Sequence, residues 1–587
     1  MLCAVIVGCA APSRAPTVAD ATAAVPPGAQ TAVAQPQAPP LPEVELTGPL
    51  LFEIVAAEVA AQRGESSAAY ATLLKAARDT RDPRLARRAT EIALGAHAAA
   101  QALDSAQLWR ELDGGSLEAE QTYAALLVAN GRYDEAQKLL QKQIHDEGEP
   151  VATLARIQRL LARAPDQARG LALLDALAAP YRNDRKHGFD VHLILAHAAH
   201  AAGQSARATE EARAALKLKP DSEQAVISAA QFMLDTKGKA EAAGRADAIA
   251  LLSGFLARNP SAAEARLAYA RLLVGDGRND AARAQFEELL RRDQRGPDPL
   301  FALGVLAMQS DLRVEARSYF ERYLQAIEGG ADREPDPAYL NLARIAEDEQ
   351  KYDEAFEWLH RVHSPDQLLT ARLREGFLLA KINRVDDALK MVREAPAESA
   401  DDRTQIVLSQ GQILRDAHRF QESFDLLAGA LQASPDDANL LYETAMSAER
   451  LDRIDVMETH LRHLVQLRPD YAHAYNALGY TLADRNIRLQ EAYELIDKAL
   501  QLAPDDGFIL DSMGWVQYRM GNLTAARDFL GRAYKLKPEA DVAAHLGEVM
   551  WNQGEHDAAR NLWREAGRRE SGNETLKETL QRLDVRP

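Results

Sequence analysis

Two pairs of histidines are the residues whose type and spacing come closest to metal chemistry. His197 and His200, and also His460 and His463, lie three positions apart, so each pair falls on one face of a helix. A zinc site needs three or four ligands, and no cysteine or Glu-containing metal motif accompanies either pair. We therefore expect these histidines on the surface or between helices, and we expect no metal and no other cofactor.

The sequence also lacks the common motifs of catalysis. It contains no His-Glu-x-x-His, no glycine-rich phosphate loop ending in Lys-Ser or Lys-Thr, and no Gly-x-Ser-x-Gly. The acidic runs Glu347-Asp348-Glu349 and Asp401-Asp402 fit solvated helix faces or turns. The chain is therefore predicted not to be an enzyme. An enzyme or enzyme subunit remains an alternative, which would require a polar constellation gathered at one place.

The elements that position these residues follow a repeat. A small residue recurs about every 34 positions through the second half of the chain. These small residues are Ala270, Gly304, Ala343, Gly376, Gly411, Ala445, Gly479, Gly514 and Gly547. An alanine follows most of them about twelve positions later, at Ala282, Ala316, Ala355, Ala388, Ala492, Ala526 and Ala559. Large apolar residues stand four positions further on, at Phe286, Phe320, Leu359, Ile496 and Trp563.

The spacing has a physical cause. Two antiparallel helices can approach closely where the small residue of one meets the alanine of the other, and the large apolar residue one turn on fills the gap to the next unit. Prolines then end the second helix, at Pro260, Pro435, Pro469, Pro504 and Pro538. Asn130-Gly131 and Gly275-Asp276-Gly277 predict tight turns. This pattern is typical of tetratricopeptide (TPR) repeats.

The predicted fold is all-α, a TPR superhelical solenoid of about 12 to 14 helical pairs, some of them degenerate. Residues 47–260 are predicted to form degenerate repeats, because 83–115, 150–185 and 225–257 match poorly. The C-terminal TPR array spans 261–566, and a capping helix is expected within 567–587. The formal net charge of −18 argues against a nucleic-acid partner, because phosphate binding needs a basic surface.

The N-terminus predicts a location. Ile6-Val7-Gly8-Cys9 resembles a bacterial lipobox, in which cleavage leaves Cys9 to carry lipid, so residues 1–9 read as the remnant of a signal peptide. No basic segment precedes this run, so the true start can lie upstream, and a short tail with incidental cysteines is the alternative. Residues 10–46 are rich in Pro and Ala and are predicted to be a disordered tether. No aspartate follows Cys9, which favours the outer membrane, facing the periplasm.

Candidate partner-binding residues lie on the first helices of the last three repeats. They are Asn476, Tyr480, Phe508, Asp511, Trp515, Tyr518, Arg519 and Trp551. In TPR proteins these positions line the concave surface, and aromatic residues and arginine dominate binding hot spots. The aromatic members could therefore form a strip for a protein partner. The alternative is that they pack between helices.

Three segments carry a family resemblance. Ala474–Arg485 (AYNALGYTLADR) and Phe508–Arg519 (FILDSMGWVQYR) are similar to the C-terminal units of LbcA-like TPR-containing lipoproteins of proteobacteria. Leu46–Phe52 (LTGPLLF), with Ala57-Glu58 and Gln62-Arg63-Gly64 after it, is also similar. The resemblance implies an outer-membrane adaptor for a periplasmic carboxyl-terminal processing serine protease of the S41 type, such as CtpA. The substrates so implied are peptidoglycan hydrolases, whose degradation the adaptor promotes.

Two functional hypotheses follow. The first is this protease adaptor, which would raise the effective concentration of a substrate at the enzyme without chemistry of its own. The second is a scaffold for envelope assembly or polysaccharide export that involves no protease.

Overall fold

The described part of the chain is built from helices. The computed structural model describes residues 42–235, 241–328 and 333–586. Within these ranges there are 31 α-helices, one 3₁₀ turn and no strand, which confirms the predicted all-α fold. Cys9, the lipobox and most of the predicted tether lie outside the described residues. Among the helices described, none is both long and apolar enough to cross a membrane.

The chain divides into two compact units between Arg278 and Asn279. The first unit holds α1 (Gly48–Gln62), α2 (Ser66–Thr80), α3 (Pro83–Gly95), α4 (Ala99–Leu112), α5 (Leu117–Ala129), α6 (Tyr133–Glu147), α7 (Pro150–Leu161), α8 (Gln167–Ala178), the 3₁₀ turn Ala179–Tyr181, α9 (Gly188–Ala201), α10 (Ser205–Leu218), α11 (Glu223–Leu234), α12 (Glu241–Arg258) and α13 (Ala263–Gly275).

The second unit continues the same pattern. It holds α14 (Asn279–Arg292), α15 (Pro297–Gln309), α16 (Arg313–Glu328), α17 (Asp336–Asp348), α18 (Tyr352–Leu359), α19 (Pro365–Lys381), α20 (Val385–Arg393), α21 (Ala400–Asp416), α22 (Phe420–Ala433), α23 (Ala438–Arg450), α24 (Ile454–Leu467), α25 (Ala472–Asp484), α26 (Leu489–Leu502), α27 (Gly507–Arg519), α28 (Leu523–Leu536), α29 (Ala540–Asn552), α30 (His556–Arg569) and α31 (Glu574–Arg582).

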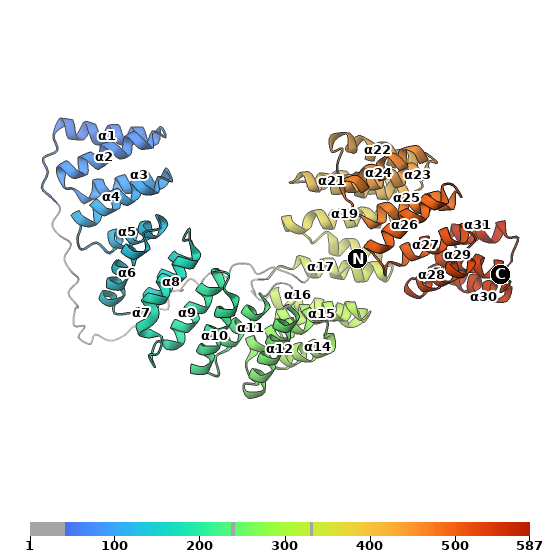
Figure 1. Cartoon of the computed structure of the whole chain (residues 1–587), viewed down its shortest axis with the longest axis horizontal. Helices are drawn as coiled ribbons and strands as arrows, with labels where there is room; N and C mark the ends of the chain where they lie inside the picture. The colour runs from blue at the N-terminus through green and yellow to red at the C-terminus, as the bar shows by residue number, and fades with distance from the viewer. Residues whose placement is uncertain (1–41, 236–240, 329–332, 587) are drawn as a thin grey trace. The chain divides into compact units, whose positions relative to one another are not determined.

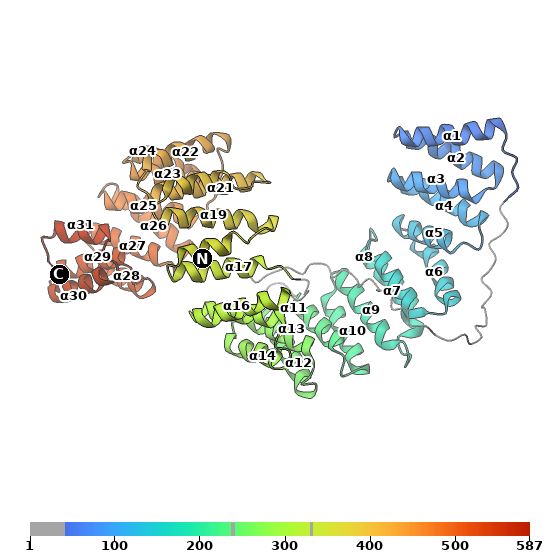
Figure 2. The same ribbon diagram turned by 180° about the vertical axis from the view of Figure 1, so that it is seen from behind.

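Within each unit, consecutive helices pack side by side, as α1 and α2 do at the blue end and α27 and α28 at the red end (Figures 1 and 2). The number of helices exceeds what 12 to 14 pairs and a cap would supply. The poorly matching segments, which were predicted to be degenerate repeats, form full helices, including α3 with α4 and α7 with α8. Their packing needs apolar faces but not the consensus residues at each position.

The predicted close approaches between helices are present. A Cβ added at Gly304 would lie 2.7 Å from the Phe320 ring, and one at Gly479 would lie 2.6 Å from Cγ1 of Ile496. Since heavy atoms do not approach so closely, a side chain at either position would have to displace its neighbour. The small residues therefore set the distance between the helices of a pair, as their spacing predicted. The side chains they meet, however, are the large apolar residues of the same pair, which were expected to fill the gap to the next repeat.

The helix ends follow local chemistry. The carboxylate of Asp506 accepts hydrogen bonds from the backbone amides of Phe508 and Ile509 at the start of α27. At the start of α21, Ser399 forms a capping box with Asp402. Gly131 closes the turn before α6 with φ +72°, a left-handed conformation that favours glycine. The predicted prolines stand two residues beyond the last residue of α12, α22, α24, α26 and α28.

The chain ends in an amphipathic helix, α31. The predicted capping helix spanned 567–587, but 567–569 still belong to α30, and α31 spans Glu574–Arg582. Leu576 and Val585 are buried in one apolar cluster with Trp563 of α30, while Lys577 and Glu578 face solvent. The C-terminal pair of helices is thus covered by a helix whose outer side is polar.

Candidate protein-binding surfaces

Residues about one repeat apart meet on neighbouring first helices. In the second unit α25 contacts α27, and α27 contacts α29. Hydrogen bonds between residues 30 to 35 positions apart connect these three helices, as between Asp511 and His545. We call the surface they form the C-terminal first-helix face. All eight partner-binding residues predicted from the sequence lie on these helices.

Trp515 lies at the centre of this face and is buried. Only 3% of it is exposed, because its ring stacks on His545 at 4.2 Å between centroids and the Arg519 guanidinium lies 5.0 Å from the indole. Its Nε1–H donates to a carboxylate oxygen of Asp484 at 3.2 Å. Trp515 therefore packs between the helices, as the alternative prediction had it, rather than standing free for a partner.

His545 and Asp511 form a buried ion pair beneath Trp515. Nδ1 of His545 lies 3.1 and 3.0 Å from the two carboxylate oxygens of Asp511. Burial alone lowers the pKa of His545, but the carboxylates of Asp511, Glu548 and Asp484 outweigh it and raise this pKa. A cationic His545 thus neutralises part of an acidic interior.

A second polar cluster connects α27, α29 and α31. The hydroxyl of Tyr518 donates to Oε1 of Glu548 at 2.9 Å, and Arg582 donates to both oxygens of that carboxylate at 2.6 and 2.5 Å. Burial, with the nearby Glu548 carboxylate, raises the pKa of Tyr518 to about 12. The amide of Asn552 donates to the Tyr518 hydroxyl at 3.0 Å. The Glu548 side chain is only 1% exposed, so hydrogen bonds from these partners must compensate for the loss of water around its charge.

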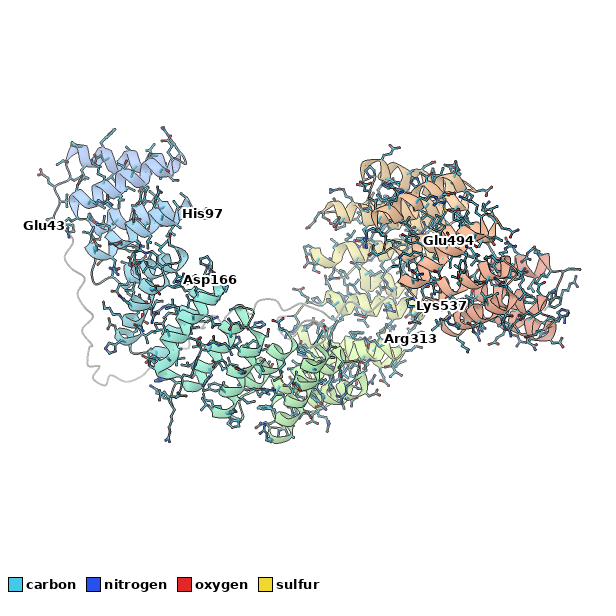
Figure 3. All side chains as sticks on the ribbon, in the orientation of Figure 1. Glu43, His97, Asp166, Arg313, Glu494 and Lys537 are labelled. Atoms are coloured by element: carbon cyan, nitrogen blue, oxygen red, sulfur yellow. The ribbon has the colours of Figure 1, made fainter. Side chains whose placement is uncertain are left out.

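The structure does not bring all the predicted aromatic residues together. Three of them lie near His545. The ring centroid of Tyr480 is 6.1 Å from that of His545, and the ring of Trp515, which stacks on His545, lies 5.1 Å from the ring of Tyr518. Phe508 is instead exposed. The ammonium group of Lys537, a residue labelled in Figure 3, lies 3.4 Å from the centroid of the Phe508 ring.

Trp551 belongs to yet another neighbourhood. Its ring stacks on His556 at 4.1 Å and lies 5.9 Å from Trp563, both on the second helix of its own pair. The guanidinium of Arg560 lies 4.9 Å from it. The expected continuous strip is therefore three separate groups: one around His545, one at Phe508 and one at Trp551.

Asn476 and Tyr480 form the open side of the first-helix face. Both are half-buried, one turn apart on α25. The Asn476 amide oxygen is shielded from solvent and has no hydrogen-bond partner. Burial raises the pKa of the Tyr480 hydroxyl, and the carboxylates of Asp484 and Asp511 raise it further. This side of the face therefore offers acceptors and negative charge.

His545, Glu548 and Arg582 are functional candidates that the sequence prediction missed. A signal for them exists: His545 stands 34 positions after Asp511, and Arg582 stands 34 positions after Glu548. Oppositely charged residues one repeat apart on first helices are placed to pair. Recognising this requires the register of the repeats and not only the residue types.

The first helix carries a different kind of surface. Phe52 is 74% exposed and Val55 is 52% exposed on α1, and Leu51 and Val59 are exposed as well. These four side chains lie at spacings of one, four and eight positions, so they share one side of the helix. We call this the α1 apolar face. Large exposed apolar patches mark interaction sites in soluble proteins.

Three of the four paired histidines contact another side chain of the protein. His197 and His200 both contact the ring of Phe232, at 5.4 and 4.8 Å between centroids. Nε2 of His463 lies 3.1 Å from Asp436. Among the described residues, no group of three or more His, Cys, Asp or Glu side chains is arranged to hold a metal ion.

Comparison with known proteins identifies the class. Models of the tetratricopeptide repeat match residues 245–303 and 512–573. The chain is 33% identical over 498 residues to the TPR repeat-containing protein PA4667 of Pseudomonas aeruginosa, a match that covers 85% of this chain and 82% of that protein. The chain therefore belongs to the family of TPR repeat-containing proteins that includes PA4667. Such repeats serve generally as scaffolds for protein–protein interaction.

Two solved structures are also similar. One is TTC0263, a TPR protein of Thermus thermophilus, with 21% sequence identity and a TM-score of 0.29 over 31% of this chain and 99% of that chain. The other is yeast Tom70, with 14% identity and a TM-score of 0.33 over 91% of this chain and 94% of that chain.

Proposed function

We propose that this protein is a noncatalytic adaptor anchored in the outer membrane and facing the periplasm. It binds a carboxyl-terminal processing serine protease of the S41 type together with peptidoglycan hydrolases, and so promotes degradation of the hydrolases. The α1 apolar face is the observation that carries the proposal. An apolar face of this kind on a repeat protein fits a stable contact with another folded protein.

The location of this face connects it to the family. Leu51 and Phe52 end the Leu46–Phe52 segment that resembles the LbcA-like lipoproteins, and both side chains are exposed. If these apolar side chains were buried, packing alone would explain why the segment resembles the family. Because they are exposed, the resemblance needs another explanation, and binding to the protease supplies it. The C-terminal first-helix face is a second, more polar surface in the other unit, and it suits the hydrolase.

An affinity purification tests the proposal. The lipidated protein would be purified from detergent-solubilised envelopes, and its partners identified by mass spectrometry. We expect an S41-type protease to copurify. The double variant Phe52→Ser/Val55→Ser should lose it, because loss of a hot spot costs about 2 kcal/mol or more, roughly thirtyfold in affinity. Copurification of export or assembly proteins without a protease would instead support the alternative scaffold.

A matched control separates the α1 apolar face from general surface hydrophobicity. Leu312 and Val314 are also exposed apolar residues, with Val314 80% exposed at the start of α16. Leu312→Ser/Val314→Ser removes similar apolar area from the other unit and should leave protease capture unchanged. Equal loss in both double variants would contradict a specific role for α1.

The anchor has its own test. Cys9 follows the lipobox-like residues and is the proposed lipidation site. In a protein with a working signal peptide, Cys9→Ala should move the protein from the outer-membrane fraction to the soluble periplasmic fraction. A variant that still sediments with outer membranes would exclude Cys9 as the anchor.

A further inference from the structure

The first helices of the second unit share three buried positions. Counted from the small residue of each repeat, these positions are five before it, one before it and two after it. In α27, whose small residue is Gly514, they are Ile509, Met513 and Val516, and each is at most 1% exposed. The same three positions are buried in all eight first helices from α15 to α29. We call them the joint positions.

The preceding repeat covers the joint positions. Those of α27 share one apolar cluster with Ala499 of α26, which is fully buried. In the next repeat, Val542 of α29 is buried in a cluster with Ala533 of α28. α26 and α27 contact each other and are joined only by residues 503–506, so they run in opposite directions. Each of these joints is thus filled by an antiparallel second helix that presents an alanine.

α1 presents the same three positions uncovered. Its small residue is Ala57, which is buried and stands twelve positions before the buried Ala69 of α2, the spacing found in the other repeats. The joint positions of α1 are then Phe52, Ala56 and Val59, and all three are exposed. Figure 1 shows α1 at the edge of its unit, with α2 beside it. The α1 apolar face is therefore a joint that no described helix fills.

This chain offers no good occupant for the joint. Prolines interrupt residues 10–46 so often that no run there is as long as the 14 residues of α26. The end of a second copy is unsuitable, because α31 presents the charged Lys577 and Glu578. The α1 helix of a second copy presents Phe52 and Val59 where a joint needs alanine. The occupant therefore comes from another protein.

We propose that an α-helix of the protease packs antiparallel on α1, in the place that the second helix of a preceding repeat would take. This helix is amphipathic, and it carries a small residue where it crosses Phe52, because side chains of one helix enter the grooves of the other. The inference rests on the proposed function and specifies which kind of element in the protease binds the α1 apolar face.

Site-specific cross-linking to the purified protease tests the inference on the full-length protein. p-Benzoylphenylalanine is placed at position 52 or at position 59, and the cross-linked peptides are identified by mass spectrometry. We expect both cross-links in one helix of the protease, with the residue reached from position 52 about seven positions C-terminal to the one reached from position 59. Cross-links in a strand or loop, the opposite order, or cross-links between two copies of this chain would each overturn the inference.

A charge within the joint gives a second test. Ala56→Glu puts a carboxylate between α1 and the helix of the protease, where it loses water without gaining a partner. The affinity for the protease, measured by surface plasmon resonance, should fall at least about tenfold. Because Ala56 is exposed and glutamate is a good helix former, the thermal melt should match that of wild type.

The matched control is Ala250→Glu. Ala250 is exposed on α12 of the same unit, and Asp247 precedes it by three positions, as Glu53 precedes Ala56. This variant should keep the affinity for the protease within about twofold of wild type. Equal losses in the two variants would overturn the inference.

The outcomes separate this inference from the adaptor function. If wild type captures the protease and Ala56→Glu captures it equally well, the inference fails and the adaptor function stands. If wild type captures no protease, the adaptor function itself is contradicted, and the inference fails with it.

Discussion

The first and last described helices show opposite outer surfaces on the same repeat architecture. α31 buries Leu576 against the last helix pair and presents Lys577 and Glu578 to solvent. α1 packs on α2 but presents Phe52 and Val55 to solvent. A terminal repeat needs a polar outer side to stay soluble, and α31 supplies one. α1 departs from that rule, which is why we assign its apolar face to a partner.

The largest expected effect concerns the close packing beneath α31. A Cβ at Gly547 would overlap the indole of Trp563, which is fully buried. Gly547→Ala should therefore reduce the free energy of unfolding by about 2–3 kcal/mol through overpacking. A Cβ added at Gly531 of α28 would have no neighbouring atom within 4 Å. Gly531→Ala should therefore increase the free energy of unfolding by up to about 1 kcal/mol. Denaturant unfolding of both variants measures the contrast, and equal effects would refute it.

The next effect concerns the attachment of α31. Arg582→Ala removes both guanidinium hydrogen bonds from the buried carboxylate of Glu548 and leaves it the Tyr518 hydroxyl. Because half of the Arg582 side chain is exposed, water compensates in part, and we expect a loss of about 1–2 kcal/mol. Adding Glu548→Gln should recover part of the loss, since no unpaired charge remains. A double variant less stable than Arg582→Ala would contradict the account.

A smaller effect should appear in the pH dependence of the second unit. The raised pKa of His545 means that its stabilising contribution is complete below the unfolded pKa of about 6.5 and is lost as pH rises through the folded value. His197, in the first unit, has a lowered pKa from burial and from His200, so its contribution is instead lost as pH falls. Subtracting the melting profile of His545→Gln from that of wild type isolates the first contribution. A difference that grows with rising pH would reverse the predicted sign.

The smallest expected effect on stability belongs to the α1 apolar face. Phe52→Ser/Val55→Ser changes side chains that are mostly exposed, so the free energy of unfolding should stay within about 0.5 kcal/mol of wild type. Circular dichroism melts check this. A large destabilisation would mean that these residues support the fold, and the comparison between the two ends would lose its functional meaning.

The sequence predicted the helix pairs because their packing repeats every 34 residues or so and depends on residue size. Gly479 meets the backbone of Ala492, as expected, but it also lies against Ile496 of the same pair, which was expected to fill the gap to the next repeat. The arrangement of the aromatic residues could not be predicted in the same way. Trp551 occupies the expected position, but its ring lies against His556 and Trp563 of its own pair.

The pairs of buried charged residues could not be predicted for a related reason. Asp511 was recognised as a candidate, but its partner His545 lies on the next first helix, and their pairing depends on the register between repeats. Glu548 and Arg582 likewise pair only when α31 packs on α29. The α1 apolar face was missed because exposure of a side chain depends on which helices pack around it, and periodicity alone does not show that.

Reconstituted proteolysis tests the adaptor account most directly. The purified protein, an S41-type carboxyl-terminal processing protease and a peptidoglycan hydrolase would be mixed, and loss of the intact hydrolase followed over time. We expect no cleavage by the protein alone, and a cleavage rate at least about tenfold higher when it joins the protease, since a scaffold raises the effective concentration of substrate. Leu312→Ser/Val314→Ser should preserve this stimulation and Phe52→Ser/Val55→Ser should abolish it. An unchanged rate on adding the wild-type protein would contradict the account.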